Sequence, residues 1–124
     1  MRKTITILLT AIIFSLMLAT VASAESRVEP NHEISSEAAE QTLLRLLSDP
    51  AQEAIKNYYG ELRQYWRDQI ISVEKVPNSY YYKVVMQVET FYGPHNPPYG
   101  LETMTFYISY GEIKLEKFEH QDED

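Results

Sequence analysis

The sequence predicts an α+β domain, in which N-terminal helices pack on one face of a four-stranded antiparallel meander sheet. Two observations carry this prediction. Apolar residues recur at helical spacing from residue 43 to residue 62, and the period changes to that of strands after Asp68. Turn signals then divide the second half of the chain into four segments of strand length. Helices first and strands after them are typical of this class.

Two helices are expected before the sheet. Ser36 can cap the first, which runs through Leu47. Asp49 and Pro50 predict the start of the second, because Asp is a good N-cap and Pro suits the first helical position. Gly60 can end this second helix or mark a bend in it.

Four strands are expected over residues 70–76, 80–91, 101–109 and 112–119, and a frayed acidic tail over 121–124. Alternation along the strands and the apolar stripe of the helices predict the core. Its expected members are Leu44, Leu47, Ile55, Tyr59, Val84, Met86, Val88, Met104, Phe106 and Ile108. The order of elements resembles the cystatin-like arrangement, which is an analogy of architecture and implies no activity.

The N-terminus has the three parts of a secretory signal peptide. Arg2 and Lys3 form a positive start, residues 5–21 are an apolar run, and Ala22-Ser23-Ala24 offers the small residues at which signal peptidase cleaves. We therefore expect residues 1–24 to be a signal peptide, 25–35 a flexible leader and 36–120 a single domain outside the cytoplasmic membrane. The alternative is an N-terminal membrane anchor, since the apolar run is nearly long enough to span a bilayer.

Charge and cysteine content narrow the function classes. Without Arg2 and Lys3, nine Lys+Arg remain against eighteen Asp+Glu, a net charge of −9. Such a domain repels phosphate backbones and anionic membranes, so we expect no nucleic-acid partner and no membrane contact after signal cleavage. The chain has no cysteine, which excludes thiol catalysis and cysteine-ligated zinc. No nucleophile motif or phosphate-binding glycine loop is present, so no cofactor is expected.

The segment over residues 91–101 is the most unusual part of the chain, with three prolines and two glycines between two expected strands. Prolines stiffen a loop by removing backbone freedom before folding. A stiff loop that presents Tyr92, His95, Asn96 and Tyr99 is a candidate binding surface. The alternative is that its aromatic side chains fold back and close the end of the core.

The same segment carries a family resemblance. Val88-Glu89-Thr90-Phe91, followed by Gly93-Pro94-His95-Asn96-Pro97-Pro98-Tyr99-Gly100-Leu101-Glu102-Thr103, resembles the signature of the secreted family catalogued as domain of unknown function 3888. Ala54-Ile55 with Tyr58-Tyr59-Gly60 is similar to its helical part, and the likeness covers residues 43–120. The resemblance implies a secreted protein of spore-forming Gram-positive bacteria, and it implies no catalytic residues.

Glu89 and Glu102 bracket the Pro-rich loop, and paired carboxylates can perform acid–base chemistry on glycosides. The apolar faces of the two strands place Val88 opposite Met104, so that Thr90 falls opposite Glu102. Glu89 and Glu102 then point to opposite faces of the sheet, which argues against a catalytic pair. Polar pairing that fixes the strand register is the better interpretation.

Two further features invite a functional interpretation. His95 is expected to be the one histidine in a structured context, and a single histidine is a poor metal site, so a hydrogen bond within the loop is its expected role. Residues 80–82 are three tyrosines that, with Tyr107, can form a platform for a sugar or peptide. Aromatic residues are also ordinary strand formers, with Tyr81 exposed and Tyr80 and Tyr82 facing the helices.

The sequence thus favours a secreted domain that binds a peptide, protein or cell-wall component through residues 91–101. The alternative is a small hydrolase or ligand-binding enzyme with a pocket between helix and sheet. A deep pocket lined by a histidine and a carboxylate would favour the enzyme, and a filled core would favour the binding domain.

The signal-peptide prediction is tested by mass spectrometry of the protein recovered from its host. We expect Glu25 at the N-terminus, because Ala22-Ser23-Ala24 directs cleavage after Ala24. Recovery of the full chain in the membrane fraction would instead establish the anchor.

Overall fold

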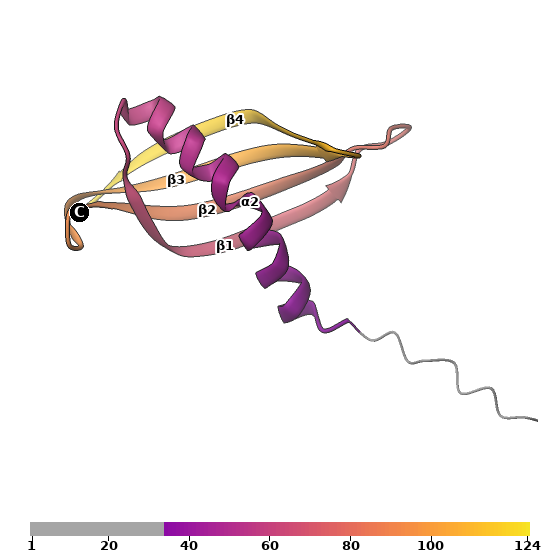
Figure 1. Cartoon of the computed structure of the whole chain (residues 1–124), viewed down its shortest axis with the longest axis horizontal. Helices are drawn as coiled ribbons and strands as arrows, with labels where there is room; N and C mark the ends of the chain where they lie inside the picture. The colour runs from indigo at the N-terminus through magenta and orange to yellow at the C-terminus, as the bar shows by residue number, and fades with distance from the viewer. Residues whose placement is uncertain (1–33) are drawn as a thin grey trace, which may run out of the picture. The chain divides into compact units, whose positions relative to one another are not determined.

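The computed structural model describes residues 34–124, and Figure 1 shows their arrangement. The expected signal peptide, and the expected leader up to residue 33, lie outside the described residues. The elements follow in the order α2 (Ser36–Tyr59), β1 (Gln64–Lys75), β2 (Tyr82–Tyr92), β3 (Asn96–Ser109) and β4 (Glu112–Glu123).

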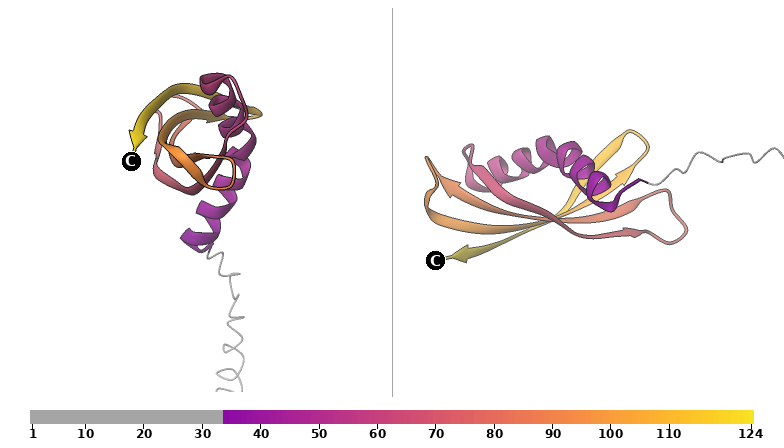
Figure 2. Two further views of the ribbon diagram at one scale, coloured as in Figure 1. Left: turned by 90° about the vertical axis from the view of Figure 1, so that its left-hand side faces the viewer. Right: turned by 90° about the horizontal axis from the view of Figure 1, so that it is seen from below.

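The α+β class is confirmed. The four strands form one antiparallel sheet in the order β1-β2-β3-β4, so each strand pairs with its neighbour in sequence. The sheet is strongly twisted and curves around α2, which crosses one of its faces obliquely (Figures 1 and 2). Within this described part of the chain, no helix is long and apolar enough to cross a membrane.

The prediction of two helices was wrong, because α2 is continuous through Pro50. Proline in a helix interior removes a hydrogen bond and costs roughly 3 kcal/mol. Leu47 and Ala51 flank the proline and are both fully buried, so one apolar face runs unbroken past it. Packing of that face against the sheet offsets the local cost, and Asp49 caps nothing.

Both ends of α2 are capped. The Ser35 hydroxyl accepts a hydrogen bond from the Ala38 amide at 3.1 Å, so the N-cap lies one residue before the one expected. Gly60 ends the helix as predicted, with φ 75°, and its amide donates to the Lys56 carbonyl. This left-handed backbone is where glycine is favoured, and it turns the chain toward β1.

The sheet is longer than the sequence pattern predicted. Strand β3 begins at Asn96, so the expected loop over 91–101 is a tight turn at residues 93–95 flanked by paired strand. Pro97 and Pro98 lie at the start of β3, where prolines are tolerated in a strand. Strand β4 continues through Glu123, so the expected frayed tail is part of the sheet.

The expected register between β2 and β3 was wrong by two residues. Met86 lies opposite Met104, and Val88 lies opposite Glu102. The period of a strand is two, so this shift leaves every side chain on its predicted face. Glu102 points into the core and Glu89 lies on the other face, as the alternation predicted.

The core lies between α2 and the concave face of the sheet. Leu47, Ile55, Met86 and Phe106 are fully buried there, and all the residues expected in the core belong to it. Tyr59 and Ile108 are its only partly buried members among those expected. Side chains therefore fill the centre of the space between helix and sheet, and pockets of about 310 and 430 Å³ remain at its margins, between α2 and β4 and between α2 and β1.

Core packing predicts a large loss of stability on truncation. We expect Met86→Ala and Phe106→Ala each to lower the free energy of unfolding by about 2–5 kcal/mol, because both side chains are fully buried. Val73→Ala on β1 is the matched control and should change it by less than about 0.5 kcal/mol, since Val73 is 53% exposed. Urea denaturation of the three variants measures this, and equal effects at buried and exposed sites would contradict the packing.

Candidate functional site

The four residues predicted to bind a partner lie on or beside the β2–β3 hairpin. Tyr92 ends β2, is 46% exposed, and donates a hydrogen bond from its hydroxyl to Glu61 Oε1 at 2.8 Å. Asn96 begins β3, opposite Tyr92, and is exposed. Tyr99 donates from its hydroxyl to the His95 carbonyl at 2.8 Å, so this side chain braces the turn.

His95 occupies the turn with a positive φ of 62°, an uncommon conformation outside glycine. Its ring stacks on Phe91 with 4.1 Å between ring centroids, and it lies 4.7 Å from the Trp66 ring. The expected hydrogen bond within the loop is made by the His95 carbonyl, while the imidazole packs against aromatic rings. The structure therefore divides the predicted residues, with His95 and Tyr92 in separate groups of contacts.

A pocket of about 460 Å³ lies between the hairpin and the connection from α2 to β1. Its lining residues are Gln52, Glu61, Leu62, Arg63, Gln64, Phe91, Tyr92 and Gly93. This volume lies within the roughly 300–1,000 Å³ range of sites that hold small ligands. Of the four predicted residues, Tyr92 is the one that borders it.

Arg63 is the charged residue buried at this pocket, with 8% of its surface exposed. Its guanidinium lies 4.1 Å from the centroid of the Tyr59 ring and 4.9 Å from that of Tyr92. A cation over aromatic faces is stabilised electrostatically, and more so where water is excluded. Contacts with the two rings thus position Arg63 in the wall of the pocket, beside the β2–β3 hairpin.

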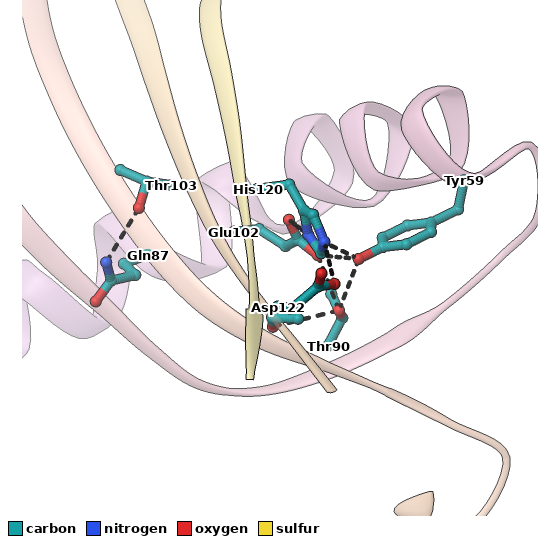
Figure 3. A network of polar contacts seen from close by, with 8 residues as sticks. Tyr59, Gln87, Thr90, Glu102, Thr103, His120 and Asp122 are labelled. Atoms are coloured by element: carbon teal, nitrogen blue, oxygen red, sulfur yellow. Dashed lines mark hydrogen bonds and ion pairs between the residues drawn. The ribbon is translucent and has the colours of Figure 1, made fainter. Parts of the chain in front are cut away.

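A second group of polar side chains surrounds Glu102, which is fully buried on the core face (Figure 3). The Tyr59 hydroxyl and the Thr90 hydroxyl donate to Glu102 Oε1, the latter at 2.9 Å. His120 Nδ1 lies 3.0 Å from Glu102 Oε2, and its Nε2 lies 2.9 Å from Asp122 Oδ1. The expected contact between Thr90 and Glu102 is thus present, although Thr90 lies directly opposite Gly100.

Gly100 leaves room for this cluster. A Cβ at that position would lie 2.5 Å from Glu102 Oε1, 2.6 Å from the Tyr59 hydroxyl and 2.8 Å from Thr90 Oγ1. Such distances are far inside van der Waals contact, so any larger residue would displace the polar groups from one another. The backbone of β3 therefore approaches the cluster in a way that only glycine permits.

His120 lies between two carboxylates. Partial burial acts to lower its pKa, but the hydrogen bonds with Asp122 and Glu102, and the negative charges of both, outweigh it and raise the pKa above the ordinary 6.5. A neutral imidazole has one N–H, whereas the imidazolium can donate to both carboxylates at once. Burial, followed by the hydrogen bond to Glu102, raises the pKa of Tyr59, which keeps its hydroxyl a donor.

This arrangement is suited to holding elements together. Both ring nitrogens of His120 are engaged by carboxylates, which leaves neither free to accept a proton from a substrate. Glu89, on the other face, accepts hydrogen bonds from Trp66 at 2.8 Å and Arg67 at 2.9 Å. Over residues 34–124, no group of three or more His, Asp or Glu side chains is placed to hold a metal ion.

His120 was not among the predicted site residues, because the last strand was expected to end at residue 119. The missed signal was the alternation of β4, in which Phe118 packs against the core and His120 follows two residues later on the same face. Extending that period, with Glu102 two residues before Met104 on β3, would have brought the histidine and the carboxylate together.

The three consecutive tyrosines lie at the other end of the strands. Tyr80, Tyr81 and Tyr82 are 77%, 37% and 47% exposed, so Tyr80 and Tyr82 are not covered by a helix as expected. The physical reason is that α2 crosses the sheet obliquely and passes over β1, away from this end (Figure 1). Tyr81 and Tyr107 lie near each other, with 6.3 Å between ring centroids.

The fold and these contacts define a small α+β domain whose helix end, central strands and last strand meet at one buried carboxylate. The family model described as "Protein of unknown function (DUF3888)" matches residues 39–122, and the chain belongs to that family. No curated protein and no solved structure matches the chain. The resemblance inferred from residues 43–120 is therefore confirmed.

The contacts of His120 predict that stability falls as pH rises. Its folded pKa is raised above the unfolded value, so the contribution is fully present below pH 6.5 and is lost as pH rises through the folded pKa. Chemical denaturation across this window should show the fall for the native chain, and His120→Gln should flatten it. His95→Gln is the matched control for the loss of an imidazole, because no carboxylate bonds the His95 ring in residues 34–124. An unchanged profile in His120→Gln would contradict the role of the histidine.

Proposed function

We propose that this protein is an exported bacterial domain that binds a peptide, protein or cell-wall component at the β2–β3 hairpin. The observation that carries the proposal is the pocket of about 460 Å³ whose wall includes Phe91, Tyr92 and Gly93 of that hairpin. The Pro-rich segment thus contributes in two ways: residues 91–93 line one wall of the pocket, and residues 93–95 form an exposed turn.

The hairpin is held in place before any partner arrives, which supports a recognition role. Tyr99 braces the turn from β3, and His95 is fixed against Phe91 and Trp66. Tyr92 is tied to Glu61 across the pocket. A preorganised surface loses less conformational entropy on binding than a mobile one.

The filled core supports binding at the hairpin over the enzyme alternative. That alternative needs a catalytic pocket between α2 and the sheet. The centre of this space is occupied by buried residues such as Leu47, Met86 and Phe106, and neither pocket at its margins, between α2 and β4 or between α2 and β1, is lined by a histidine. Within residues 34–124, the cluster that contains His120 and Glu102 has its polar groups bonded to one another.

The proposal is tested by photo-crosslinking in the host cell. A photoreactive phenylalanine analogue at Tyr92 should capture a partner, because Tyr92 borders the pocket and is 46% exposed. The same analogue at Tyr110 is the matched control. Tyr110 is 91% exposed and lies in the β3–β4 turn, at the opposite end of the strands.

The two positions separate specific capture from chance encounters. We expect a discrete product at Tyr92, identified by mass spectrometry, and none of the same mass at Tyr110. Absence of a product at Tyr92, or the same product at both positions, would count against binding at the hairpin.

A further inference from the structure

Arg63 is a buried cation without a counter-ion in the described part of the chain. It is 8% exposed, and its Nε has no hydrogen-bond partner. None of the ion pairs formed by residues 34–124 includes it. Burying an N–H without an acceptor is unfavourable, and more so in a charged group, so the described residues leave this Nε–H in need of an acceptor.

The neighbouring carboxylates are already engaged elsewhere. Glu102 accepts from Tyr59 and Thr90, and its Oε2 lies 3.0 Å from His120 Nδ1. Glu61 lines the same pocket, but its Oε1 accepts from the Tyr92 hydroxyl. The polar cluster around Glu102 therefore does not form an ion pair with Arg63.

The aromatic contacts leave the guanidinium suited to a planar anion. Tyr59 and Tyr92 lie against the guanidinium at 4.1 and 4.9 Å. The N–H groups of a guanidinium form a planar fork that binds a carboxylate with two parallel hydrogen bonds. Arg63 also lines the pocket, so a ligand in that pocket reaches it.

We infer that this pocket recognises a carboxylate of its ligand through Arg63, and that the fitting source is the free C-terminal end of a peptide. This inference rests on the proposed binding function and names the chemical class of the ligand. A peptide end offers one carboxylate with amide groups close behind it. Gln52 and Gln64 in the lining can bond such amides, while Leu62 and Phe91 offer apolar contact.

Charge favours a carboxylate over a phosphate. A phosphate monoester carries close to two negative charges at neutral pH. The pocket has one cation, Arg63, and it also contains Glu61, whose carboxylate repels a dianion. A monoanion matched by one guanidinium is the ligand that this lining tolerates.

The test is an NMR titration of the protein, purified as its host produces it, with acetate and with acetamide. The two probes have the same shape and differ in charge. We expect acetate at tens of millimolar to shift the Arg63 Nε–H signal, together with amides of residues 61–64 and 91–93. Acetamide at the same concentration should leave the Arg63 signal in place. Equal responses to both probes, or none to acetate, would overturn the inference.

Variants and a peptide pair complete the experiment. Arg63→Lys keeps the charge but loses the fork, and should weaken acetate binding about tenfold, as expected for loss of a bidentate pair. Arg45→Gln removes an exposed arginine of α2 and should change nothing. If Arg63→Lys fails to fold, the comparison of acetate with acetamide in the native chain still decides the matter.

The source of the carboxylate is decided with N-acetyl-Ala-Leu-Ala and its C-terminal amide. Preference for the free acid, with binding tighter than that of acetate, supports a peptide end. Acetate binding without any gain from the peptide restricts the site to small carboxylates and overturns that assignment. Failure here is distinct from failure of the proposed function, because crosslinking at Tyr92 reports capture whatever group the partner presents.

Discussion

The structure depends on one buried negative charge. Glu102 lies within the core face of β3 with no exposed surface, and a carboxylate in such a place must be bonded from the protein itself. Its donors come from the end of α2, from β2 and from β4, so a single side chain joins four elements. Removing one partner of such a buried pair typically lowers the free energy of unfolding by about 3–5 kcal/mol, because the remaining charge stays buried without compensation. The cluster therefore fixes where α2 ends relative to the sheet and how far β4 pairs.

That constraint also positions the proposed binding pocket. Tyr59 is held by its hydroxyl at Glu102, and its ring supports the guanidinium of Arg63 four residues later. Gly60 turns the chain between these two residues. The Tyr59 side chain therefore links the polar cluster, which its hydroxyl contacts, to Arg63 at the pocket, which its ring contacts.

Features that depend on a repeating pattern along the chain were predicted correctly from the sequence. Predictions failed where contacts between residues far apart in sequence determine the structure. Period-two alternation identified the buried face of β2 and β3 correctly, although the register was wrong by two residues. Pro50 and the prolines at 97 and 98 read locally as breaks, yet the structure carries a helix through the first and a strand through the others. In each case tertiary pairing or burial outweighed the local preference.

The candidate site shows the same division. Tyr92 was found because the Pro-rich segment is unusual in itself, whereas Arg63 has no local signature and His120 has only the alternation of β4. Arg63 matters because the fold places Tyr59 and Tyr92 close to it, and His120 matters because β4 lies beside Glu102. Such roles depend on contacts between residues far apart in sequence, and the pattern within one segment does not predict these contacts.

The two open edges of the sheet have a consequence for behaviour at high concentration. An unpaired edge strand is a template on which the strand of another molecule can add, which is the first step toward fibrils. Strand β1 interrupts that template with register shifts near Trp66 and Ile70, and β4 does so opposite Thr105. Charged side chains occur along much of the outer strand β4. A domain built in this way can leave both edges uncovered and still resist cross-β assembly.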